Sequence, residues 1–121
     1  MKYMLLIYHD ELAWDSLSES ERQETYREYR QLTQEITSSG HHLSGSQLNP
    51  SRSAKSVRVR NGKHLVTEGP FAETREQLGG YFLIEAKDFE EATGIAARIP
   101  SARVGTVEVR PLAESAAPTP E

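Results

Sequence analysis

The chain contains no cysteine, which excludes disulfide bonds and thiolate metal ligands. It also lacks any apolar run near the roughly 18 residues that a membrane-spanning helix requires. The apolar stretch at residues 3–8 ends at His9-Asp10-Glu11, so it is too short and too quickly acidic for a signal peptide. We therefore expect a cytoplasmic protein with no membrane partner.

Clustered positive charge is absent as well. The 14 Lys and Arg residues are interleaved with 18 Asp and Glu residues, and the net charge is −4. Binding to nucleic acid requires clustered cations that neutralise phosphates, so we expect no nucleic-acid partner. The length of 121 residues, with 36% hydrophobic residues, is typical of one soluble globular domain.

Motifs for bound cofactors are missing too. Gly69 and Gly79-Gly80 fit neither G-x-G-x-x-G nor the P-loop. No His and carboxylate set has metal-ligand spacing, and no Ser lies in a nucleophile-elbow context. We expect neither a metal nor a cofactor.

The periodicity of apolar residues predicts seven elements. Ser18 and Glu21 have the spacing of a capping box, and Gly40 suits the end of a helix over 17–39. Asp88 is the predicted cap of a second helix that Pro100 stops. Strands are expected at the ranges 3–8, 43–48, 81–86 and 106–112.

The sequence Asn61-Gly62 between two alternating segments predicts a hairpin with a type I′ turn. A two-residue loop pairs Arg60 with Lys63 and Val59 with His64. One face of the hairpin then carries apolar or neutral side chains, from Val57, Val59, His64 and Val66.

The order strand, helix, strand, hairpin, strand, helix, strand predicts an α+β fold, a ferredoxin-like sandwich with an inserted hairpin. This domain covers residues 1–112, and the small, Pro-rich residues 113–121 are expected to be a disordered tail. Both helices should cover one sheet face, through Tyr3, Leu5, Ile7, Phe82, Ile84, Val107 and Val109. The other face is too apolar for open water, with Met4, Leu6, Tyr8, Tyr81, Leu83, Glu108 and Arg110.

The segment Glu68-Gly69-Pro70-Phe71, with its continuation to Gly79-Gly80-Tyr81, resembles the signature of the YCII-related, DGPF-type domain family. Glu68 stands where that family usually has Asp. The resemblance extends to the start of the chain and to the segments 98–100 and 107–112. It implies a dimeric α/β barrel, in which two sheets pack face to face as a homodimer. Some family members use a His-Asp pair, and no His of this chain matches its position.

The residues themselves leave two interpretations of this loop open. Gly and Pro set backbone angles that other residues resist, so the loop is either a shaped functional site or a plain strand connector. In the second interpretation, residues 72–77 form a helical turn that Gly79-Gly80 caps.

Candidate site residues follow from the second sheet face. If a partner covers it, Glu108 and Arg110 point into an enclosed space where Tyr8 and Tyr81 supply hydroxyls, and these four are the candidate substrate-binding residues. If it stays open, the two charges are simply solvated. His9, at the end of the first strand, is a candidate acid or base.

The resemblance makes Glu68 the other candidate catalytic residue; alternatively its carboxylate caps its own loop. It also implies a small-molecule ligand and cofactor-independent proton transfer of the lyase or isomerase type, because a few relatives are linked to elimination chemistry on aromatic compounds. The alternative is a non-catalytic module that binds a ligand or a protein, since relatives are often associated with alternative sigma factors.

Overall fold

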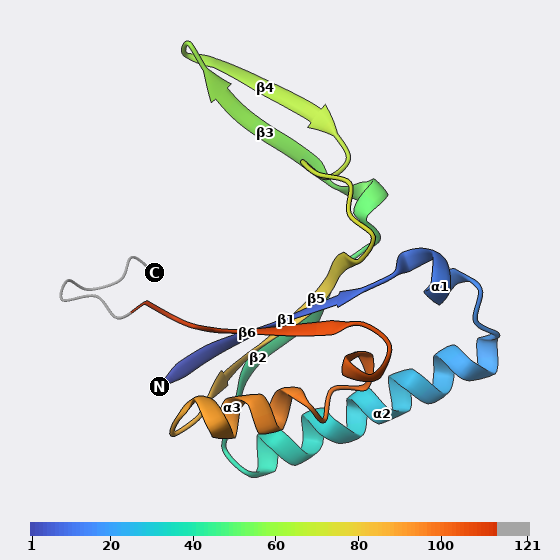
Figure 1. Ribbon diagram of the computed structural model, residues 1–121, viewed down its shortest axis with the longest axis vertical. Coiled ribbons are helices and arrows are strands. Elements are labelled where there is room, and N and C mark those ends of the chain that lie inside the picture. Colours follow the sequence, from blue (N-terminus) through green and yellow to red (C-terminus); the bar gives the residue numbers. More distant parts are fainter. Residues whose placement is uncertain (114–121) are drawn as a thin grey trace.

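The computed structural model describes residues 1–113, and the fold has helices on one face of an antiparallel sheet (Figure 1). Residues 114–121 lie outside the described part, and with them nearly all of the predicted tail. The elements in chain order are β1 (Lys2–His9), α1 (Glu11–Asp15), α2 (Glu19–Ser38), β2 (His42–Gln47), the 3-10 turn η1 (Ser51–Ser53), β3 (Lys55–Arg60), β4 (Lys63–Glu68), β5 (Gln77–Glu85), α3 (Phe89–Ala96), the 3-10 turn η2 (Pro100–Arg103) and β6 (Thr106–Pro111).

The main sheet has the strand order β2-β5-β1-β6, and every neighbouring pair is antiparallel. The predicted mixture of α and β elements is confirmed. Strand alternation places Tyr3, Leu5 and Ile7 on the face that the helices cover, and all three are buried. Leu32 and Ile36 of α2 close over them, and burial of these side chains is the main stabilising term of the fold.

Local sequence signals explain where the helices begin. The Ser18 side chain accepts from the Glu21 N–H, and the Glu21 carboxylate accepts from the Ser18 N–H, which is the predicted capping box. Asp88 caps α3 by accepting from the Glu91 N–H. The described helices include none long and apolar enough to cross a membrane.

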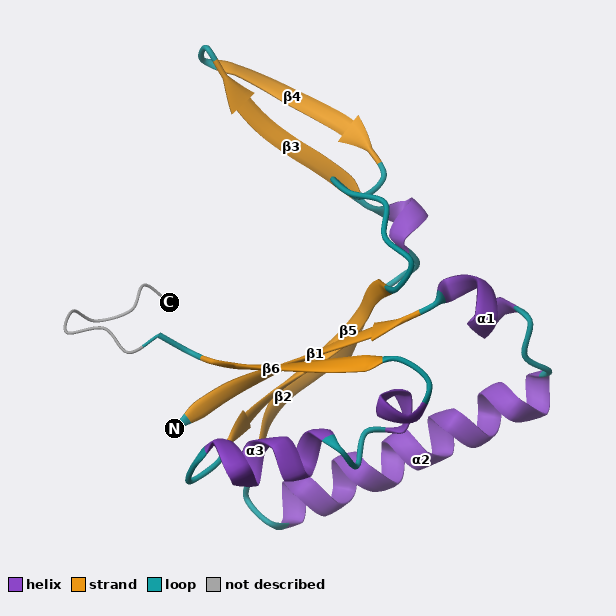
Figure 2. Ribbon diagram, viewed as in Figure 1, coloured by secondary structure: helices purple, strands orange, loops and turns teal. Residues whose placement is uncertain are grey.

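The hairpin forms as predicted, with Arg60 opposite Lys63 and Val59 opposite His64. Asn61 and Gly62 both have positive φ, as a type I′ turn requires. The hairpin is nevertheless a separate two-stranded sheet, and Figure 2 shows it projecting away from the layered body. His64 is exposed on it.

The loop between the hairpin and β5 differs from the strand connector with a helical turn that was one of the two interpretations of the sequence. Residues 72–77 form no helical turn, and Gly79-Gly80 lie inside β5 instead of capping a helix. Gly80 pairs with Ile7 on one side and with Gln47 on the other, so ladder hydrogen bonds outweigh the turn preference of glycine. β5 therefore starts four residues before the predicted strand at 81–86.

Candidate functional site

A cavity of about 370 Å³ lies between α2 and the helix-facing side of the main sheet. Ile7 and Phe82 form part of its floor, and Tyr26 and Tyr29 line it from α2. The short helix α1, which the sequence analysis did not foresee, contributes Trp14 at one end. The cavity is thus on the opposite side of the sheet from the predicted site.

Aromatic rings surround this cavity. The Trp14 ring meets the rings of His9 and Tyr26 edge to face, at centroid distances of 6.1 and 5.5 Å. The Tyr29 ring stacks on Phe82 at 6.4 Å, and His42 meets the same Phe82 edge to face at 5.8 Å. Such walls favour a planar, largely apolar ligand.

His9 lies at this cavity because of a bulge in β5. Ile7 pairs with Gly80 but Tyr8 pairs with Leu78, so Gly79 is the extra residue. A Cβ atom on Gly79 would lie 2.5 Å from the His9 Nε2 atom, so the ring occupies the space that glycine leaves free. Within residues 1–113 neither ring nitrogen of His9 makes a hydrogen bond, although Nε2 packs closely against Gly79.

Glu11 holds the mouth of the cavity in shape. Its carboxylate accepts from the Ser51 N–H at 2.7 Å and from the Ser51 hydroxyl at 2.5 Å. Its own N–H donates to the Gln77 Oε1 atom at 3.0 Å. One residue therefore joins α1, η1 and the start of β5. Because its oxygens are engaged, Glu11 acts as a brace; Asp15 and Arg52 supply further charges to the lining.

The hydroxyl of Tyr29 is a partly buried polar group of this wall. It lies 2.6 Å from the Ser101 Oγ atom, which connects α2 to η2. Burial raises the pKa of the Tyr29 phenol above its usual value, and the hydrogen bond to Ser101 opposes part of that rise. Tyr29 therefore stays neutral at physiological pH and presents a ring face to the cavity.

Of the six predicted site residues, the structure brings His9 and Tyr81 to the cavity. Tyr81 contributes through the strand that it shares with Phe82, while alternation directs its side chain to the other sheet face, beside Leu6. Tyr8 is half-buried on that same open face.

The other three predicted residues lie away from the cavity. Glu108 and Arg110 form an ion pair with each other on the outward face of β6. Glu68 ends β4 on the projecting hairpin, with 80% of its side chain exposed, and its carboxylate lies 3.5 Å from the Lys55 Nζ atom. Roles for these residues, and for Tyr8, stay predictions that require a second chain.

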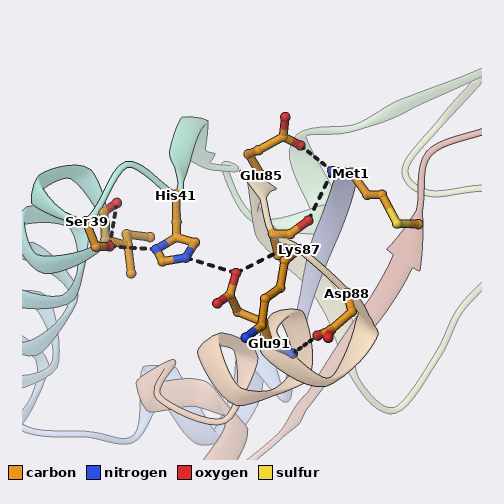
Figure 3. A network of polar contacts seen from close by, with 9 residues as sticks. Met1, Ser39, His41, Glu85, Lys87, Asp88 and Glu91 are labelled. Carbon is orange, nitrogen blue, oxygen red and sulfur yellow. Dashed lines mark hydrogen bonds and ion pairs between the residues drawn. The ribbon is translucent and has the colours of Figure 1, made fainter.

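A separate polar cluster joins the ends of α2 and α3 (Figure 3). His41 contacts Ser39 through Nδ1 at 2.6 Å and Glu91 through Nε2 at 3.1 Å. The Lys87 backbone N–H, together with His41, holds the pKa of Glu91 below its usual value. His41 links two helices and His42 lines the cavity, because the short turn after α2 carries both back onto the body.

Sequence reasoning missed most of the cavity lining. Tyr26 and Tyr29 are three residues apart on α2, a helical spacing that marks a face turned to the sheet but does not distinguish a cavity wall from a packed core. Trp14 had no predicted place. The sequence signal that could have revealed helix α1, and with it the place of Trp14, was Asp10. This residue caps α1 by accepting from the N–H groups of Leu12 and Ala13. In the described residues no group of three or more His, Cys, Asp or Glu side chains is arranged to hold a metal ion.

Comparison with known proteins identifies the family. The model of the YCII-related domain matches residues 1–116. An uncharacterized protein of Rhizobium meliloti (strain 1021) is 34% identical over 115 residues, which cover 93% of each chain. The chain therefore belongs to the YCII-related domain family.

Proposed function

We propose that this protein binds a small ring compound in the cavity between α2 and the sheet, and that His9 transfers a proton to or from it without a cofactor. The observation that carries the proposal is the aromatic cavity with the His9 ring at its wall and no hydrogen bond to that ring from the described residues. The volume of about 370 Å³ is near the lower end of small-molecule sites, which favours a ligand of one or two rings.

The chemistry assigned to His9 is general base catalysis. A neutral imidazole nitrogen accepts a proton from an acidic C–H bond of the ligand, and the C–H electron pair forms a new C=C bond. In an elimination, a leaving group departs with its bonding pair and the imidazolium later loses its proton to water. In an isomerisation, the new C=C bond displaces the electron pair of an existing double bond of the ligand towards a second carbon atom, and the imidazolium returns the proton to that carbon. Both outcomes are of the lyase or isomerase type.

Trp14 provides a direct test of binding because it is the single tryptophan of the chain and lines the cavity. Titration with 4-hydroxybenzoate or catechol should quench its fluorescence saturably. Thr33→Phe places a ring in the cavity and should weaken binding about tenfold or more. Thr37→Phe, one turn along on an exposed position, is the matched control. Quenching that never saturates, or that Thr33→Phe leaves unchanged, contradicts the site.

The non-catalytic alternative, a ligand-binding accessory module, uses the same cavity without the base. Deuterium uptake from D2O into a ring ketone such as 2-cyclohexenone, followed by proton NMR, distinguishes the two. Proton transfer by His9 predicts exchange above the solvent rate, lowered about a hundredfold by His9→Gln while Trp14 quenching persists. Equal exchange rates for both proteins would leave only the binding function.

The proposal includes a homodimer of the ferredoxin-like, dimeric-barrel kind. The strand order β2-β5-β1-β6 with both main helices on one face supports it. So does the open face, where Met4, Leu6 and Leu83 are half-buried although no helix or strand within residues 1–113 packs over them. In such a dimer, Tyr8, Tyr81, Glu108 and Arg110 would face the partner.

A further inference from the structure

Every residue of the strands β3 and β4 except Ser56 is exposed. On one face of this hairpin Val57, Val59 and Val66 are 62%, 56% and 60% exposed. The pair Lys55 and Glu68 lies at the base of this same face, because strand alternation carries it through both strands. We call these residues, with His64, the arm face.

A two-stranded hairpin alone in water is marginally stable at best, because it buries too little apolar surface to offset the ordering of its backbone. This hairpin nevertheless has strong local signals, with the Asn61-Gly62 turn and three valines aligned on one face. A sequence that specifies a hairpin so clearly, and leaves its apolar face open in the single chain, requires a covering surface.

The same chain has a second uncovered surface at the open sheet face, but its own hairpin forms a separate sheet that stands apart from this face (Figure 1). In a pair of copies, the arm face of each chain can reach the open sheet face of the other. Charge favours this occupant. Residues 55–68 carry four cations and one carboxylate, a net +3, so the rest of the chain carries −7. The projecting segment is thus attracted to the body of another copy.

The charged pairs also match locally. Lys55 and Glu68 on the arm face form an exposed ion pair, and so do Glu108 and Arg110 on the open face of β6. When two such pairs meet, each cation can exchange its carboxylate for one across the interface, so no charge loses its partner. The valines of the arm face then lie along the β6 edge, beside the apolar centre of the open face that the partner's sheet covers in the proposed dimer.

We propose that the hairpin of one copy docks through its arm face on the β6 edge of the open sheet face of a second copy, and reciprocally. This interface rests on the proposed homodimer and adds to it a specific contact, in which Glu68 of one chain joins Glu108 and Arg110 of the other. The polar cluster of Glu68, Glu108 and Arg110 is therefore shared between two chains, and it is incomplete in one.

The absence of cysteine makes the test clean, because each introduced thiol is the sole one in its chain. Chains carrying Val59→Cys are mixed with chains carrying Thr106→Cys, on the open face of β6, and treated with a short bismaleimide. The proposal predicts a mixed cross-linked dimer. Leu65→Cys is the matched control, because it is exposed on the opposite face of the same hairpin and should cross-link poorly.

Equal yields from Val59→Cys and Leu65→Cys, or a product in which two hairpins are joined to each other, overturn the docking. Sedimentation of the natural chain separates the possible failures. A dimer without the mixed product keeps the homodimer and rejects the hairpin contact, whereas a monomer rejects both. Quenching of the Trp14 fluorescence by 4-hydroxybenzoate tests ligand binding in the cavity independently of either result.

Charge exchange provides a second measurement. Arg110→Glu should weaken the dimer about two- to fivefold, and adding Glu68→Arg to the same chain should restore it. Additive effects of the two substitutions contradict the contact.

Discussion

Gly79 determines where the His9 ring lies, because it has no side chain and the ring fills the space that a side chain would occupy. A Cβ atom there would be 2.5 Å from the His9 Nε2 atom, and the ring is the part that can move. We expect Gly79→Ala to displace the ring, abolish the deuterium exchange assigned to His9, and lower the free energy of unfolding by about 1–3 kcal/mol.

Gly94→Ala is the control, because a Cβ atom on Gly94 meets nothing within 4 Å and helix α3 gains about 0.5–1 kcal/mol from the change. Urea unfolding gives the stabilities, and the ring signals of His9 in NMR spectra give its position. Unchanged His9 signals in Gly79→Ala would contradict the packing described for this pair.

The Tyr29 phenol predicts an alkaline dependence of stability. Its pKa is near 10.0 in the unfolded chain and higher in the folded protein, because burial disfavours the phenolate. The folded state therefore binds more protons above pH 10, and the free energy of unfolding falls as the pH rises through that range. Below pH 10 this contribution is fully present.

Tyr29→Phe removes this dependence and also the contact with Ser101, so it should cost about 0.5–1.5 kcal/mol at pH 7. Denaturant unfolding from pH 7 to pH 11 measures both effects. Tyr26→Phe, at a half-exposed ring beside Trp14, should change neither. An equal alkaline loss in Tyr29→Phe and the natural chain would contradict the assignment.

Elements with strong local signals were the predictable part of the fold. The capping box at Ser18 and the Asn61-Gly62 turn each depend on contacts within four residues, so the sequence contains the whole cause. The segment 69–81 was harder, because Gly80 takes its conformation from partners on two distant strands. Helix α1 is only five residues long and is braced by Ser51 and Gln77, which no local pattern reveals.

The capping box itself provides a prediction at this scale. Ser18→Ala leaves the Glu21 N–H without its acceptor at the start of α2, and should lower the free energy of unfolding by about 1 kcal/mol. Ser38→Ala, at the exposed last residue of the same helix, should change it by less than about 0.5 kcal/mol. Thermal or urea unfolding measures the difference, and equal losses would assign Ser18 no capping role.

At the scale of the whole molecule, the sequence predicted which residues lie on each face of the sheet, but it did not predict which face carries the cavity. Tyr3, Leu5 and Phe82 are buried under the helices, as their alternation indicated. The cavity on that side was not foreseen, because its walls combine residues from seven elements that lie far apart in the sequence. The hydropathy pattern marks apolar positions but not the gaps between them.

The open face predicts a dimer. Leu83 lies in its centre, opposite Met4, so Leu83→Lys should place a charge in the interface and yield a monomer. The natural chain should sediment as a dimer at micromolar concentration. Leu43→Lys, on the edge strand β2, is the control and should remain dimeric. A clean monomer for the natural chain would rule out the homodimer.

The claim on which the account depends is that the ligand lies on the helix side of the sheet, beside His9, and not on the open face. Methyl-labelled protein mixed with 4-hydroxybenzoate decides this through intermolecular NOEs, because Ile7 lines the cavity while Met4 and Leu83 lie on the opposite face. The account predicts NOEs from the ring protons to the Ile7 methyl groups and to Trp14. NOEs to Met4 and Leu83, with none to Ile7, would contradict it.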